Sequence, residues 1–195
     1  MSIETFHYDF TERATRKAVF GPLVERLDNR EKFKVASVVN DYSIRDKEHL
    51  HDIAAVERAI GASIASDWAK AQAKAVYRIL ANAEAQVHDC PVEQTHFHEV
   101  GLGMTCREVL AICTAIELLA PQRITATPIQ VGSGTVECAH GLLDIPAPAT
   151  AAIIEAYGIP VVEDKLDGEL CTPTSAALIA HFVDEFVEVA AGARA

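Results

Sequence analysis

Several features that mark common protein classes are missing from this chain of 195 residues. It has no run near the roughly 20 consecutive apolar residues of a membrane span, so we expect no membrane partner. Its 28 Asp and Glu outnumber its 17 Lys and Arg. The resulting net charge of −11 argues against a nucleic-acid or anionic-membrane partner. The N-terminal segment has no apolar signal region, so we expect a cytoplasmic protein.

Paired cysteines are also missing. The five cysteines are dispersed and form no CxxC pair: Cys90, Cys106, Cys113, Cys138 and Cys171. An odd, scattered set is typical of reduced thiols and argues against a disulfide framework or a zinc knuckle. Cys138 and Cys171 lie beside motifs discussed below, and we expect them to be small buried thiols.

Half of the residues are hydrophobic, which is enough to build the core of a single domain over residues 1–195. Their spacing predicts helices over residues 12–27 (broken or kinked at Pro22), 46–61, 68–87 (capped by Ser63 or Ser66), 108–120, 148–158 and 172–186. β-branched or alternating runs predict strands over residues 32–40, 93–100, 123–131 and 160–164. The sequence therefore predicts an α/β fold with a helix-rich first half, followed by a mixed, partly parallel sheet packed by helices.

Residues 95–101, THFHEVG, carry two imidazoles and a carboxylate. In an extended chain His96 and His98 point to one face, about 7 Å apart, and can share one metal ion. Glu99 then projects to the other face unless the chain turns, which Gly101 permits. The alternative is a polar strand end without a metal.

Residues 131–135, VGSGT, form a second candidate site. Gly132, Ser133, Gly134 and Thr135 follow a predicted strand, and their backbone N–H groups can approach an anion such as phosphate. The stretch is neither a P-loop nor a dinucleotide-binding fingerprint, so a plain tight β-turn is the alternative. His140 follows closely and adds a third imidazole that only folding could bring to the first site.

Thr172 and Thr174 flank a proline at the start of a predicted helix. Their hydroxyls lie beside unpaired N–H groups, a setting that suits phosphate or carboxylate, or simply a helix cap. His49 and His51 are two residues apart in another predicted helix. We expect them to point to different faces, to be solvated and not to chelate together easily.

The blocks THFHEVG, VGSGTVECAHGLLDIPAPAT and DGELCTPTSAALI occur in an order that resembles the LarC family of nickel-insertion proteins, over about residues 47–187. This family completes the nickel-pincer cofactor of lactate racemase. The resemblance implies a chelatase (lyase) that places nickel into a sulfur-bearing pyridinium mononucleotide, consuming CTP and requiring a divalent metal. It implies nickel ligands at His96, His98 and His140, catalytic carboxylates at Glu99 and Asp9, and a mononucleotide site at residues 132–135, Thr172 and Thr174.

The first 46 residues depart from the family pattern. Where the family has a glycine-rich block, Asp-Pro-Phe-Ser-Gly-x-Ser-Gly-Asp-Met, this chain reads YDFTERATRKAVFG. Asp9, Phe10 and Gly21 are retained. Charged residues replace the loop glycines: Glu12, Arg13, Arg16 and Lys17. We therefore divide the chain into a diverged segment, 1–46, and a family-like core, 47–187.

Two further departures concern chemistry. Met104 stands where the family has a carboxylate, which leaves Glu108 nearby. We expect the C-terminal domain that full-length members use with CTP and metal to be absent from this protein and to be carried by a separately encoded partner. The alternative is a non-catalytic, diverged paralogue that binds metal or a nucleotide-like ligand. The very apolar helix at 108–120 suits a homo-oligomer contact as readily as a core.

Overall fold

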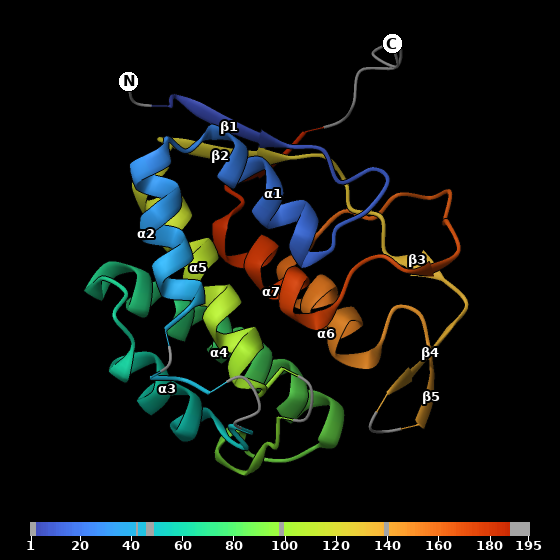
Figure 1. Cartoon of the computed structure of the whole chain (residues 1–195). Coiled ribbons are helices and arrows are strands. Elements are labelled where there is room, and N and C mark those ends of the chain that lie inside the picture. Colours follow the sequence, from blue (N-terminus) through green and yellow to red (C-terminus); the bar gives the residue numbers. More distant parts are fainter. Residues whose placement is uncertain (1–2, 42, 46–48, 98–99, 139–140, 188–195) are drawn as a thin grey trace.

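A three-stranded parallel sheet lies along one side of the molecule in the computed structural model, which describes residues 3–41, 43–45, 49–97, 100–138 and 141–187 (Figure 1). Its strands are, in spatial order, β1 (Thr5–Tyr8), β2 (Arg123–Ala126) and β7 (Glu185–Phe186). In β1, Phe6 and Tyr8 are buried while Thr5 and His7 are exposed. Alternation of this kind gives the sheet one face for the helices and one for solvent.

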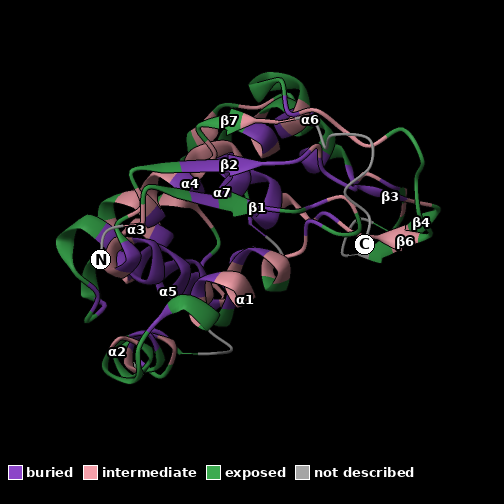
Figure 2. Ribbon diagram, turned by 90° about the horizontal axis from the view of Figure 1, so that it is seen from above, coloured by how far each residue is buried: buried purple, intermediate pink, exposed green. Residues whose placement is uncertain are grey.

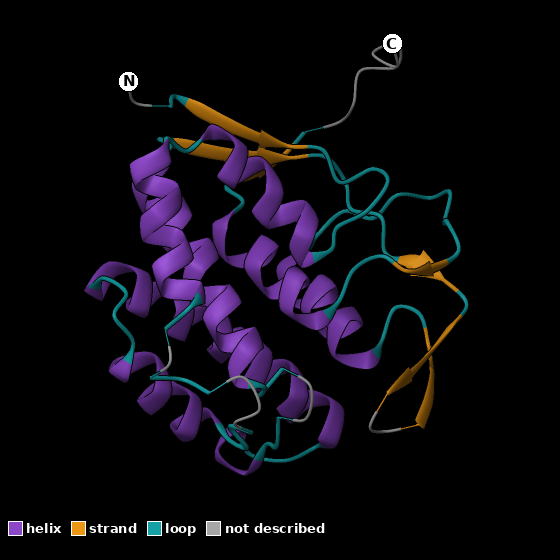
Figure 3. Cartoon of the chain, in the orientation of Figure 1, coloured by secondary structure: helices purple, strands orange, loops and turns teal. Residues whose placement is uncertain are grey.

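The helices of the described residues lie together on one side of this sheet (Figure 3). They are α1 (Arg16–Arg26), α2 (Asn29–Val39), α3 (Ile53–Ala62), α4 (Asp67–His88), α5 (Gly103–Leu119), α6 (Pro148–Tyr157) and α7 (Pro173–Phe182), with a short 3₁₀ turn, η1 (Val92–Gln94). Helix α5 is central: it contacts α1, α2, α3 and α4. Of its 17 residues, 13 are buried, and Figure 2 shows it as a mostly buried element. The predicted helix buried on most sides is confirmed.

Two small antiparallel pairs lie beyond the end of the main sheet. Strand β3 (Gly132–Ser133) pairs with β6 (Gly168–Glu169). Strands β4 (Thr135–Cys138) and β5 (Gly141–Asp144) form a hairpin that projects from the helical body (Figure 1). Together with the parallel sheet, these pairs confirm the predicted α/β class with a partly parallel sheet.

Several predicted elements are confirmed in detail. Ser66 caps α4, and its side chain accepts a hydrogen bond from the N–H of Ala69. Pro148 stands in the first turn of α6, and Thr172 caps α7 with Pro173 directly after it. These positions suit residues that supply a side-chain acceptor or lack an N–H group.

The predicted strand over residues 32–40 is wrong, because this segment is helix α2. Asp28 and Glu31 form a capping box at its start. Val35 and Val38, one turn apart, are buried, and α2 packs on α5. A valine-rich run therefore becomes helical, because packing and capping outweigh its modest β preference.

Other boundaries differ from the predictions. The helix expected over residues 46–61 begins only at Ile53, behind the cap Asp52. The last helix ends at Phe182, and residues 185–186 pair with β2 instead. Helix α1 continues through Pro22 rather than breaking there. Val19 and Leu23 are buried and pack that helix on the core. The free energy of this packing offsets the loss of the backbone hydrogen bond that proline cannot make.

Two predicted strands are not formed by the residues of their segments that the structure describes. In the stretch 93–100, residues 92–94 form the turn η1 and residues 95–97 adopt no strand. The stretch 160–164 makes a single bridge, between Val161 and Ile129. No helix in the described part of the chain combines the length and apolar character needed to cross a bilayer.

Asp41 joins the segment that follows α2 to the loop that follows α3. Its carboxylate accepts hydrogen bonds from the N–H groups of Ser43, at 2.9 Å, and Ile64, at 2.8 Å. Burial acts to raise the pKa of Asp41, but these backbone hydrogen bonds outweigh it, and the pKa lies below its usual value. The charged carboxylate therefore stabilises the fold.

We predict that Asp41→Asn lowers the free energy of unfolding by about 1.5–3 kcal/mol at pH 7, because a charge-assisted hydrogen bond is lost. A depressed pKa means stability that is present above the pKa of the unfolded chain, about 3.9, and lost as the pH falls through the folded value. The deficit of the variant in urea unfolding should therefore shrink below about pH 4. A deficit that is constant with pH would contradict this role of the charge.

Candidate functional site

The loops that leave β1 and β2 at their carboxyl ends run side by side. The N–H of Thr127 donates to the carbonyl of Tyr8 at 3.0 Å, and that of Gln130 to the carbonyl of Phe10 at 2.9 Å. The N–H of Phe10 donates to the hydroxyl of Thr127 at 2.8 Å. In sheets with parallel strands this edge is where ligands commonly bind.

Asp9 lies at that edge, directly after β1, and its side chain is exposed. Its Oδ1 accepts hydrogen bonds from the N–H of Thr11, at 3.0 Å, and from the Thr11 hydroxyl, at 2.6 Å. The predicted catalytic carboxylate therefore also shapes the turn that leads into α1, and it remains accessible from solvent.

The N-terminal ends of α1 and α7 meet beside this edge. The N–H of Ala14, next to the α1 cap Thr15, donates to the carbonyl of Leu170 at 2.8 Å. The N–H of Leu170 in turn donates to the carbonyl of Val131 at 3.1 Å. Val131 directly precedes β3, here called the glycine strand. Helix N-termini carry partial positive charge, so two of them side by side favour an anion.

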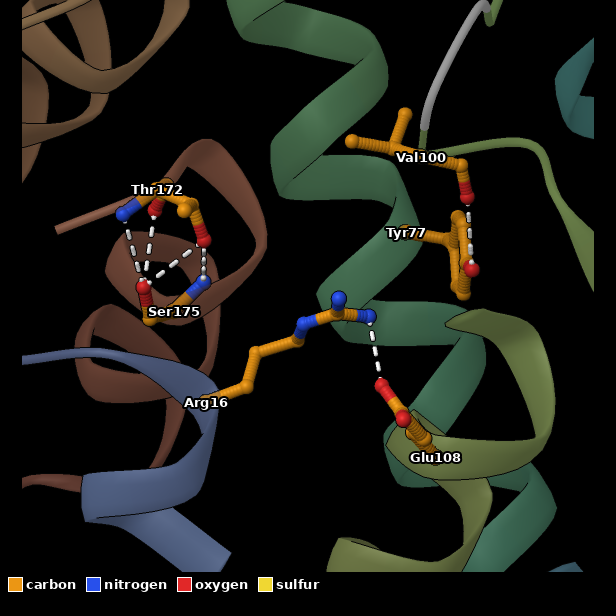
Figure 4. A network of polar contacts seen from close by, with 6 residues as sticks. All are labelled: Arg16, Tyr77, Val100, Glu108, Thr172 and Ser175. Carbon is orange, nitrogen blue, oxygen red and sulfur yellow. Dashed lines mark hydrogen bonds and ion pairs between the residues drawn. The ribbon is translucent and has the colours of Figure 1, made fainter. Parts of the chain in front are cut away.

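The start of α7 is held by its own side chains (Figure 4). Thr172 and Ser175 form a capping box, with the Ser175 side chain accepting from the N–H of Thr172 at 2.9 Å. Thr174 is buried and Thr172 is half-buried. Cys171 is buried as expected, and burial raises its pKa to about 12, so this thiol is uncharged at neutral pH. The side chain of Cys138 lies outside the described residues.

An ion pair joins α1 to α5 next to that cap. Arg16 Nη1 lies 2.6 Å from Glu108 Oε2, and both side chains are about one-third exposed, at 33% and 36%. Figure 4 shows the guanidinium reaching from α1, past the α7 cap, toward α5. Met104 and Glu108 are one helical turn apart on α5, so they lie on the same face of that helix. Arg16 therefore brings a cation into the space between the two helix starts and α5.

The segment 95–101 that carries His96 and His98, here called the histidine loop, is anchored on both sides of its centre. Phe97 is fully buried, with its ring edge-on to that of Tyr77 at 5.9 Å between centroids. Its N–H donates to the carbonyl of His51 at 2.8 Å. The Tyr77 hydroxyl donates to the carbonyl of Val100 at 2.9 Å (Figure 4). A buried aromatic residue of α4 therefore fixes the backbone before and after the middle of the loop.

Of the predicted metal ligands, His96 is exposed, on the loop just before Phe97. His98, Glu99 and His140 lie outside the described residues, so the predicted convergence of the imidazoles stays a prediction. On either side of His140 in the sequence, Cys138 ends β4 and Gly141 begins β5, and these two residues are paired. Within the described ranges, no group of three or more His, Cys, Asp and Glu side chains is placed to hold a metal ion.

The glycine strand is packed closely against β6. Gly132 has a φ of +88°, and a Cβ there would lie 1.8 Å from the carbonyl oxygen of Gly168. Its N–H donates to Gln130 Oε1 at 3.0 Å, and the Ser133 hydroxyl donates to the carbonyl of Leu166 at 2.9 Å. Gly134 has a φ of +94°, and Thr135 begins β4. Glycine is needed here for the close approach of two backbones, whatever the strand also binds.

A hollow of about 410 Å³ lies on the α6 side of the glycine strand. Its wall is mostly apolar, with three charged side chains, and none of the predicted site residues lines it. The lining residues are Val131, Pro146, Ala151, Ile154, Glu155, Val161, Val162, Glu163 and Lys165. This hollow therefore adds no support to the predicted phosphate site.

His49 and His51 differ from the prediction. They precede α3 instead of belonging to it, and their Nδ1 atoms lie 2.9 Å apart. The expectation that the two rings point to different faces of a helix is wrong, because the helix starts only behind the cap Asp52. In an extended stretch, residues two apart share a face.

The motifs of this chain are those of a known protein family. A family model described as "Nickel insertion protein" matches residues 11–194. The chain belongs to the nickel insertion protein family. The match includes the histidine loop, the glycine strand and the start of α7, and it confirms the resemblance to the LarC family.

Several curated relatives of this nickel insertion family member are 38% identical to it. One from Dictyoglomus thermophilum, named "Putative nickel insertion protein", aligns over 151 residues, 76% of this chain and 37% of the relative. One from Desulfitobacterium hafniense, named "Pyridinium-3,5-bisthiocarboxylic acid mononucleotide nickel insertion protein", aligns over 138 residues, 71% and 33%. The chain thus spans roughly a third of the length of these relatives. No solved structure matches it.

Two features of this family member were missed by sequence reasoning. The ion pair between Arg16 and Glu108 joins residues far apart in the chain, and no local pattern signals it. The juxtaposition of His49 and His51 could have been found, because Asp52 is a good helix cap and places both histidines before the helix.

We predict that Gly132→Ala destabilises the protein by about 2 kcal/mol or more, because the residue needs a positive φ and a Cβ meets the backbone of Gly168. Gly61→Ala is the matched control, since a Cβ there meets nothing within 4 Å and the residue lies in α3. The control should be neutral or stabilising by up to about 1 kcal/mol. Thermal unfolding followed by circular dichroism measures both. Equal midpoints for Gly132→Ala and the wild type would show that β3 and β6 are not closely packed.

Proposed function

We propose that this chain takes part in placing nickel into a pyridinium bis-thiocarboxylate mononucleotide, the reaction in the name of its Desulfitobacterium hafniense relative. The observation that carries the proposal is the family match over residues 11–194. Nickel is the substrate metal in this reaction, and the mononucleotide precursor is its acceptor.

The nickel ligands proposed are His96, His98 and His140, with Glu99 as the group that accepts protons displaced from the ligands. Neutral imidazoles suit nickel, and a carboxylate suits proton transfer. The anchoring of Phe97 and Val100 supports this assignment, because a fixed loop backbone limits the freedom its ligands lose on binding a metal.

The mononucleotide phosphate is proposed to bind between the starts of α1 and α7. Support comes from the two helix N-termini and from the Arg16 guanidinium, which can hold phosphate oxygens with two parallel hydrogen bonds. The proposed contacts are residues 132–135 and the Thr172–Thr174 turn, with Asp9 as a catalytic carboxylate at the same sheet edge.

The remaining parts of the proposal follow the family. CTP is consumed and a divalent metal is required, as the resemblance implies. Because the chain spans 33% of the Desulfitobacterium hafniense relative, the full reaction is proposed together with the rest of such a protein, carried on a partner chain. We also propose a cytoplasmic location. Helix α5 is buried within the chain, so the proposed homo-oligomer uses another surface.

A second candidate function is binding of nickel or of a nucleotide-like ligand without turnover. Met104, 46% exposed at the start of α5, favours it, because it supplies no carboxylate where the family pattern has one. The nearest acidic residue on that face, Glu108, is engaged by Arg16. A carboxylate that is already paired with a guanidinium is a poorer ligand for a hard cation.

We predict that the wild-type chain, supplied with nickel, CTP, a divalent metal and a candidate partner domain, forms the nickel–mononucleotide product, detected by mass spectrometry. The His96→Ala/His98→Ala variant should lose at least about tenfold in rate, because two ligands are removed. His88→Ala, which alters a histidine at the end of α4, is the control. Nickel binding without product, with and without the partner, would favour the second function.

We predict that Arg16→Ala weakens binding of the mononucleotide precursor by about 10- to 100-fold, the effect of losing a charge-assisted hydrogen bond of about 1.5–3 kcal/mol. Stability should change by less than about 1 kcal/mol, because the Arg16–Glu108 pair is partly exposed. Arg58→Ala removes an exposed cation from α3 and should leave the affinity unchanged. Calorimetry measures both. Equal affinities for Arg16→Ala and the wild type would remove this residue from the phosphate site.

A further inference from the structure

Two imidazoles outside the proposed site face each other, and their nearest nitrogens are close enough to bind the same atom. The Nδ1 atoms of His49 and His51 lie 2.9 Å apart, with ring centroids 4.4 Å apart and ring planes at 44°. His51 is exposed and His49 is half-buried. The pair is therefore accessible to an ion from solvent.

The backbone explains why the two rings share a side. The stretch 49–51 is extended and lies antiparallel to the end of the histidine loop, with a bridge between His49 and Leu102. The N–H of Leu50 donates to the carbonyl of Gly101 at 2.7 Å. The Leu50 side chain is buried, so its two neighbours project to the opposite side, toward solvent.

Two glycines allow the backbone before and within this stretch to approach the residues at and just before the start of α5. A Cβ at Gly101 would lie 2.4 Å from the carbonyl oxygen of Leu50, and one at Gly103 would lie 1.9 Å from that of Arg45. No other residue type fits without moving the backbone. The position of the histidine pair therefore depends on the same segment that carries the histidine loop.

Two nitrogens at this separation can share a proton or a metal ion. Nitrogens bound to one ion at about 2.0–2.1 Å are about 2.9 Å apart at a right angle, and about 3.3 Å apart at a tetrahedral angle. The observed distance suits the right angles of square-planar or octahedral nickel better than tetrahedral zinc. It equally suits one N–H···N hydrogen bond between neutral rings.

We propose that His49 and His51 chelate nickel through their Nδ1 atoms and form an acquisition site beside the histidine loop. The choice of nickel rests on the proposed function. Among the residues that the structure describes, no third His, Cys, Asp or Glu completes a cluster with the pair. A site with two protein ligands binds weakly and releases its ion readily, which suits transfer to the neighbouring loop.

The transfer of nickel is supported by the hydrogen bonds that join the backbone of the histidine pair to that of the histidine loop. The carbonyl of His51 accepts the N–H of Phe97, which directly follows His96. On the other side, Leu50 is bonded to Gly101. The pair therefore lies along the anchored backbone of the histidine loop, and an ion released from it has a short path to that loop.

The decisive variant is His49→Asn/His51→Asn. Asparagine keeps a hydrogen-bonding group close to the position of Nδ1 but is a poor nickel ligand, so a role in hydrogen bonding alone would survive the change. His7→Asn is the matched control, because His7 is an exposed histidine on the outer face of β1, bonded to Thr125.

Titration of the full chain with nickel chloride should show that the double variant loses one class of site that the wild type and His7→Asn retain. Each single variant should weaken that site by about 100-fold, because the second imidazole adds to the first within one molecule. X-ray absorption at the nickel edge of the loaded protein should count fewer imidazoles in the double variant. Unchanged stoichiometry together with an unchanged imidazole count would overturn the proposal.

Gly103→Ala tests the same site without altering a histidine. It should displace Ile44 and Arg45, which precede the histidine pair, and weaken the same class of nickel site, while Gly61→Ala should not. Circular dichroism establishes that each variant is folded. A folded Gly103→Ala protein with wild-type nickel binding would contradict the proposed geometry.

A product assay separates this inference from the proposed function. With nickel in excess, the double-asparagine variant should form the nickel–mononucleotide at the wild-type rate. With nickel limiting, its rate should fall by about tenfold or more. Equal rates at limiting nickel would overturn the transfer. If the wild type forms no product at all, the proposed function fails, while the nickel titration still decides whether the histidine pair is a metal site.

Discussion

The close contact of the Arg45 and Leu50 backbone with Gly103 and Gly101, at and just before the start of α5, is the constraint on which the candidate site depends. Gly101 and Gly103 leave no room for a Cβ where the carbonyls of Leu50 and Arg45 pass. Helix α5 is buried along most of its length, so it cannot shift without disturbing the core. Both histidine-bearing segments, and the Glu108 carboxylate one turn further on, are therefore held by the same rigid helix.

Charge is distributed unevenly about this scaffold. The chain as a whole carries −11, which attracts cations such as nickel to its surface over the range of the Debye length. At the carboxyl edge of the parallel sheet, the starts of α1 and α7 and the Arg16 guanidinium make a local region that favours an anion. In the proposed function, the metal cation and the phosphate-bearing acceptor therefore bind different groups, which limits their competition.

The sequence predicts those helices whose starts are marked by a capping residue or a proline. Helices α4, α6 and α7 were found because Ser66, Pro148 and Thr172 mark their starts. Helix α2 was mistaken for a strand because its valines obscured a capping box, and β7 was missed because two residues become a strand only by pairing with β2. The site was predicted as motifs, but contacts between distant segments, such as that of Arg16 with Glu108, depend on packing that no local pattern encodes.

A change of pH can act on the histidine loop in two ways: through the Tyr77 hydrogen bond that anchors it, and through its imidazoles. Tyr77 is fully buried, and loss of solvation raises the pKa of its hydroxyl well above the usual value. The hydroxyl therefore stays protonated and keeps donating to Val100 throughout the neutral range. A metal ion binds the neutral form of an imidazole, so protons compete with the metal for a histidine ligand. A fall in nickel affinity on mild acidification would then reflect the histidine ligands themselves, because the backbone that carries them is held by a bond that does not titrate there.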